Sequence, residues 1–176
     1  MSRLSSTIGA LAALTLLTGC TETTSGPETR LTASQTPLTA VVASARGSGH
    51  RVRTDRLLTF AFTAQSKADG SADGNYHVNF QSLGVKFDVD VTCMSVVGNR
   101  AWIAGIVRRV DGPIVEEGTV SYFYVTDNGE GDGVVDEISG VRINDVAGQD
   151  LVFCTERPTA LPSVPIEIGN AQVSGG

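Results

Sequence analysis

Apolar and polar residues alternate with a period of two along most of the chain from residue 57 onward. In the segment 85–91, valine and phenylalanine occupy the odd positions, and Lys86, Asp88 and Asp90 lie between them. This period places successive side chains on opposite faces of a β-strand. The pattern predicts about nine strands, at 57–65, 76–82, 85–91, 93–97, 100–107, 118–126, 137–143, 150–155 and 166–173.

Residues that favour tight turns separate many of these segments. Gly98 and Asn99 divide two predicted strands, and both residue types accept a positive φ, which predicts a hairpin there. Gly140, inside the segment 137–143, indicates a β-bulge. No stretch keeps an amphipathic period of 3.6 over a length that predicts a helix. We therefore expect an all-β domain over residues 45–174, an antiparallel β-sandwich or barrel of about nine strands.

The N-terminus has the pattern of an export signal. Arg3 precedes an apolar run at 8–17, which is too short to span a bilayer and has the length of a signal-peptide core. The run ends in LTGC, residues 17–20, which resembles the lipobox of bacterial lipoproteins. This resemblance implies a lipoprotein signal peptide over 1–19 and acylation of Cys20, whose acyl chains would hold the protein on a membrane. In the alternative, the signal is an ordinary cleaved one and Cys20 is incidental.

Residues 20–44 are predicted to form a flexible tether of the lipidated chain. They are rich in threonine and serine and have few large apolar side chains, so they cannot bury enough surface to offset chain entropy. We expect a protein of the bacterial cell envelope, and Thr21 in place of Asp favours the outer membrane if the host has two membranes. The formal net charge is −6 without clustered basic residues, so nucleic acid is not an expected partner. A protein or glycan partner is not specified by the sequence.

With Cys20 assigned to lipid, two cysteines remain, Cys93 and Cys154. Both would meet an oxidising compartment after export, which favours a disulfide between them. The chain-entropy relation gives such a long loop roughly 4 kcal/mol of stabilisation. Two separate buried thiols are the alternative.

The segment 127–137 holds five carboxylates and three glycines. Asp127, Glu130, Asp132 and Asp136 are candidate ligands for a calcium ion, which takes oxygen donors. The alternative is an acidic, solvated turn between strands. We favour the turn, because the loop lacks a bidentate carboxylate at its end and its glycines raise the cost of ordering it. No other cofactor is expected.

Asp88 and Asp90 are the most plausible pair for catalysis. They share one face of a predicted strand with Cα atoms roughly 6.6 Å apart, a spacing that suits the two carboxyl groups of an inverting glycoside hydrolase. Lys86 on the same face favours ordinary solvent exposure instead. We therefore assign no catalytic residue. The leading hypothesis is a lipid-anchored envelope domain with a binding or structural role, and an envelope glycan hydrolase that uses Asp88 and Asp90 is the alternative.

Several short motifs lie within residues 45–172. They are Gly47-Ser48-Gly49, Phe60-x-Phe62-x-Ala64, Ala68-Asp69-Gly70-Ser71, Cys93 with Val97-Gly98-Asn99-x-Ala101, Gly105, and Asp127-Asn128-Gly129-Glu130. Together these motifs resemble a family of short exported bacterial β-domains with no assigned activity. The resemblance implies the β-fold and export, and it implies nothing about a mechanism.

Overall fold

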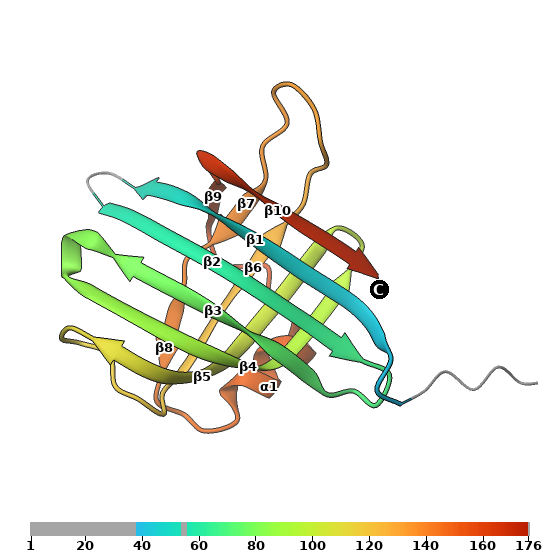
Figure 1. The fold of residues 1–176 in the computed structure, drawn as a ribbon, viewed down its shortest axis with the longest axis horizontal. Coiled ribbons are helices and arrows are strands. Elements are labelled where there is room, and N and C mark those ends of the chain that lie inside the picture. Colours follow the sequence, from blue (N-terminus) through green and yellow to red (C-terminus); the bar gives the residue numbers. More distant parts are fainter. Residues whose placement is uncertain (1–37, 54–55, 176) are drawn as a thin grey trace, which may run out of the picture. The chain divides into compact units, whose positions relative to one another are not determined.

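A single antiparallel sheet makes up most of the fold, seen in a computed structural model that describes residues 38–53 and 56–175. The sheet curls into a half-barrel with strand order β10-β1-β2-β3-β4-β5-β6-β7-β9, and β8 also pairs with β6 (Figure 1). The all-β prediction is confirmed. Of the two expected architectures, a curled sheet is found rather than two packed sheets. Within the described ranges, no helix has the length and apolarity needed to cross a bilayer.

The strands run along the chain in the following order, with one 3₁₀ turn and one helix. They are β1 (Val41–Arg53), β2 (Arg56–Lys67), β3 (Ala72–Phe80), η1 (Gln81–Leu83), β4 (Val85–Val97), β5 (Arg100–Asp111), β6 (Val120–Thr126), β7 (Glu137–Ser139), β8 (Arg142–Asn144), α1 (Gln149–Glu156), β9 (Ser163–Pro165) and β10 (Ile168–Gly175).

The hairpin and the bulge predicted from glycines are both present. Val97 pairs with Arg100, and between them Gly98 has a φ of 59°, as the first central residue of a type II′ turn requires. At Gly140, the stretch from Val125 to Tyr122 on β6 spans four residues, and the stretch from Ile138 to Arg142 opposite it spans five. One extra residue is therefore accommodated around Gly140, which separates β7 from β8.

Strand β1 corrects the predicted tether, because the strand begins at Val41 and so takes in the end of the segment 20–44. The positions of β1 that face the interior carry small residues: Ala43, Ala45, Gly47 and Gly49. A Cβ at Gly47 would lie 2.8 Å from the ring of Phe62 and 2.6 Å from the carbonyl oxygen of Asn170. Close approach of β2 and β10 therefore requires small residues at these positions of β1.

The predicted strand at 150–155 is wrong, because these residues lie in helix α1. The buried residues of this helix are Asp150, Phe153 and Cys154, which have the i, i+3, i+4 spacing of one helix face. Leu151 and Val152 are exposed and made the run resemble a buried strand. The helix packs against β4, β5 and β6.

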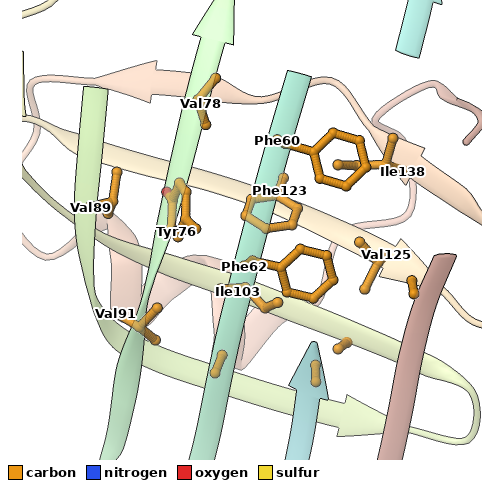
Figure 2. Close-up of a cluster of buried hydrophobic side chains, with 14 of the residues drawn as sticks. Phe60, Phe62, Tyr76, Val78, Val89, Val91, Ile103, Phe123, Val125 and Ile138 are labelled. Carbon is orange, nitrogen blue, oxygen red and sulfur yellow. The ribbon is translucent and has the colours of Figure 1, made fainter. Parts of the chain in front are cut away.

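Two apolar clusters lie against the sheet. The larger fills the concave side and is built around aromatic rings, with the centroids of Tyr76 and Phe123 5.0 Å apart and those of Phe62 and Phe123 5.5 Å apart (Figure 2). Ile103 and Ile138 are fully buried in it. The odd-numbered residues of 85–91 are all buried, so the predicted alternation there is confirmed.

The smaller cluster lies under helix α1. Cys93 on β4 and Cys154 on α1 form the predicted disulfide, with their Cα atoms 6.2 Å apart. Beside it, the Trp102 Nε1–H donates to the carbonyl oxygen of Pro158 at 3.0 Å, and the Tyr124 hydroxyl donates to that of Leu161 at 2.7 Å. The disulfide and these two hydrogen bonds fix the helix and the segment after it on the sheet.

Candidate functional site

One end of the half-barrel contains a hollow of about 200 Å³. We call it the end hollow. One wall is formed by the end of β1, the start of β2 and the end of β3. The rest of the lining comes from η1, from the connection between β7 and β8, and from the residue before β9. The lining residues are Arg51, Leu58, Phe80, Leu83, Gly140, Val141, Arg142 and Pro162.

Strand register places three of the lining residues in a row. Arg51 of β1 pairs with Leu58 of β2, which pairs in turn with Phe80 of β3. Arg51 follows Gly49 in the interior alternation of β1, and its side chain is enclosed, with 7% exposure. Gly140 lies in the opposite wall and leaves space in front of Arg51. The nearest atom to a Cβ added at Gly140 would be Arg51 Nη1, 4.0 Å away.

The lining combines apolar surface with arginine N–H donors. Of the eight lining residues in the described part of the chain, five are Leu58, Phe80, Leu83, Val141 and Pro162, and the two charged ones are Arg51 and Arg142. None of these eight is a Ser, Cys, His, Asp or Glu. These described lining residues therefore suit binding of an apolar group that carries a hydrogen-bond acceptor.

The loop between β6 and β7, which contains the candidate calcium ligands, lies beside β10 (Figure 1). Asp136 is 4% exposed, and its Oδ2 accepts the backbone N–H of Ala171 at 2.7 Å. Asp127 Oδ2 accepts the backbone N–H of Val173 at 2.8 Å. Both amides belong to β10, the edge strand of the sheet. They lie on the side of β10 that does not pair with β1. We call this pair of carboxylates the edge latch, because they accept hydrogen bonds that a further strand would otherwise accept.

The other two candidate ligands do not join the edge latch. Glu130 accepts side-chain hydrogen bonds from Asn170 at 3.0 Å and from Gln172 at 3.4 Å, and Asp132 is exposed. Among the residues that the structure describes, no group of three or more His, Cys, Asp or Glu side chains is placed to hold a metal. The favoured alternative, a solvated turn, is wrong for Asp127 and Asp136, and calcium binding stays a prediction without support from this geometry.

Asp88 and Asp90 lie on the outer face of β4 in separate ion pairs. Asp88 Oδ1 contacts His77 Nδ1 at 2.7 Å, and its Oδ2 accepts hydrogen bonds from Arg109. The hydrogen bond from His77, followed by that from Arg109, outweighs partial burial and holds the pKa of Asp88 below its ordinary value. Asp90 pairs with Arg108 at 3.2 Å. A depression of about 230 Å³ adjoins Asp88, and Asp90 is not among its lining residues.

The hydroxyl-bearing side chains of Tyr76 and Ser121 are both buried in the core. Burial raises the pKa of Tyr76, and the hydroxyl of Ser121 acts in the opposite direction. The phenol therefore stays neutral at physiological pH. Neither residue lines the end hollow, so this pair supplies no chemistry there.

Sequence reasoning missed Arg51 and the end hollow. A signal was present, since Arg51 continues the interior alternation of Ala43, Ala45, Gly47 and Gly49. A charged residue at an interior position is rare and indicates a special environment. The signal was obscured because the small residues before it did not identify a strand.

No protein-family model, curated protein or solved structure matches the chain. The class of protein is therefore defined by the structure itself: a small all-β domain with a curled antiparallel sheet, a disulfide-attached helix and a partly apolar hollow at one end. The resemblance to short exported bacterial β-domains stays a prediction.

Proposed function

We propose that the protein is a lipid-anchored domain of the bacterial cell envelope that binds a small ligand in the end hollow and carries out no catalysis. The observation that carries this proposal is the row formed by Arg51, Leu58 and Phe80, which places an enclosed arginine beside apolar surface in a cavity. Pockets of this composition are the usual form of a small-molecule site.

The location of the end hollow suits an anchored protein. The signal peptide at 1–19, Cys20 and the tether up to residue 37 lie outside the described residues, so the anchor rests on the sequence. The tether leads into Val41, and Arg51 lies ten residues further along β1, roughly 33 Å away at the rise of a strand. The hollow thus lies at the opposite end of β1 from Val41, where this strand begins. The disulfide between Cys93 and Cys154 suits an oxidising compartment.

An envelope glycan hydrolase using Asp88 and Asp90 is the alternative. A hydrolase of this type needs one carboxylic acid with a raised pKa and two carboxyl groups that face one substrate. The pKa of Asp88 is lowered, and the depression beside it is not lined by Asp90. Release of reducing sugar from envelope glycan by the wild type, abolished in Asp88→Asn, would favour the hydrolase over the binding module.

Anchoring is tested with Cys20→Ser in cells that export the protein. We expect intact-mass measurement of the wild type to show acyl groups on Cys20, and cell fractionation to find it in membranes. The variant should be found as a soluble protein or as an uncleaved precursor, with its domain folded. A mature wild-type protein that begins elsewhere and carries no lipid would refute the anchor.

Binding is tested by titrating 1-hexanol into the full mature chain carrying Cys20→Ser, so that no acyl chain competes. The methyl NMR signals of Leu58 and Val141 report on the end hollow, and those of Val91 in the core serve as the control. We expect saturable shifts at the first two only. If the signals of Leu58 and Val141 do not shift with 1-hexanol, hexanoate or hexylammonium, the end hollow is not a binding site.

A further inference from the structure

We propose that the end hollow selects anionic ligands, namely monocarboxylates with a short apolar body of about six carbons. This inference rests on the proposed function, because it specifies the ligand of the same site. It follows from the size of the hollow and from the sign of the charges in its lining.

Size limits the ligand to a small molecule. A closed cavity of about 150 Å³ lined by Leu, Ile and Phe holds one benzene molecule. The end hollow, at about 200 Å³, has room for a body slightly larger than benzene. Leu58, Phe80 and Val141 supply apolar contacts for it. A long acyl chain or a folded peptide segment exceeds this volume.

Charge in the lining selects the polar end of the ligand. Among the described residues, two arginines and no carboxylate line the hollow. Arg142 is exposed, and within the described part of the chain its side chain makes no hydrogen bond or ion pair. Arg51 has interactions of its own within the protein, so we assign the carboxylate contact first to Arg142. A guanidinium group presents paired N–H donors that match the two oxygens of a carboxylate.

The net charge of the protein makes this selectivity diagnostic. The formal charge is −6, so long-range attraction over the whole surface favours cations. Tighter binding of an anion than of a cation therefore has to come from a local site. Tighter binding of the cation would indicate binding to the negatively charged surface as a whole.

The test compares three probes with the same six-carbon chain: hexanoate, 1-hexanol and hexylammonium. Affinity is taken from the methyl NMR shifts of Leu58 and Val141 in the full mature chain carrying Cys20→Ser. We expect hexanoate to bind roughly five-fold more tightly than 1-hexanol, as one exposed ion pair allows, and hexylammonium to bind most weakly.

Three variants assign the selectivity. Arg142→Gln should weaken hexanoate about five-fold and 1-hexanol by less, so that the two probes bind with similar affinity. Arg108→Gln removes an exposed arginine from the outer face of β5 and should change neither. Gly140→Val adds a side chain in the open space facing Arg51 and should weaken all three probes, with the unfolding midpoint as the check that the variant is folded.

The outcomes separate the two proposals. Equal or tighter binding of 1-hexanol than of hexanoate would overturn the anion selectivity and leave the binding site in place. Unchanged hexanoate affinity in Arg142→Gln would also overturn it. Absence of shifts with all three probes would overturn the proposed function together with this inference.

Discussion

The edge latch allows a strong prediction for Asp136→Asn, a nearly isosteric change. In the wild type the two carboxylate oxygens of Asp136 accept backbone N–H groups, Oδ2 from Ala171 at 2.7 Å and Oδ1 from Asn128 at 2.8 Å. An amide keeps one acceptor but turns an NH₂ group toward the other N–H. Because a hydrogen bond to a charged group contributes about 1.5–3 kcal/mol and the site is 4% exposed, we expect a loss of about 2–4 kcal/mol in the free energy of unfolding.

Urea denaturation of wild type and variant measures this loss, and Asp132→Asn is the matched control. Asp132 is in the same loop and exposed, so its replacement should change the free energy of unfolding by no more than about 0.5 kcal/mol. Hydrogen exchange gives a local readout, because the amide of Ala171 at the sheet edge should lose protection in Asp136→Asn before the rest of the sheet.

The reasoning would be refuted if Asp136→Asn unfolded with the wild-type free energy and the Ala171 amide kept its protection. An equal loss in Asp132→Asn would also contradict it, because the effect would then come from the total charge of the loop and not from the edge latch.

Three further predictions concern the sheet and its disulfide. Replacing Cys93 and Cys154 together by alanine should lower the free energy of unfolding by about 4 kcal/mol, because the bond joins residues 61 apart, and urea denaturation checks this. Gly105→Ala places a Cβ 2.1 Å from a backbone oxygen of β4 and should cost at least about 2 kcal/mol, whereas in Gly140→Ala the nearest atom is 4.0 Å away and stability should be unchanged. Asp88→Asn should cost about 1 kcal/mol at neutral pH. Since the folded-state pKa of Asp88 is lowered from 3.8, its stabilisation is present above 3.8 and is lost as the pH falls through the folded-state value, so the difference in thermal midpoint from wild type should close in acid.

The sequence predicted best those strands whose two faces differ in chemistry. In 85–91 the valines and the phenylalanine face the core and the charged residues face water, so alternation alone identifies the strand. In β1 the interior residues are alanine and glycine, because β2 and β10 approach closely there. Alternation between small and polar residues carries little hydrophobic signal, so the sequence predicts no strand over 41–53 and assigns the start of β1 to the tether.

The parts of the site that depend on distant residues could not be predicted. Asp136 and Ala171 are 35 positions apart and Asp127 and Val173 are 46 apart, and in each pair one partner is a backbone amide, which any residue other than proline would supply. The end hollow likewise depends on which loop closes over Arg51. Helix α1 was missed because it is short and its exposed Leu151 and Val152 break the polar face expected of a surface helix.

The pairing of β1 with β10 has a consequence for the order in which this chain acquires its structure. Ser44 and Ser174, 130 residues apart, are joined by a hydrogen bond of 2.8 Å between their hydroxyl groups across this pair. For a chain that crosses a membrane with its N-terminus first, β1 emerges early but lacks one of its two neighbours until residue 175 has followed. A partly translocated chain would therefore hold an incomplete sheet that lacks β10. Pairing over so many residues also slows folding, so an exported chain of this fold would have time to cross before it became too compact to be moved.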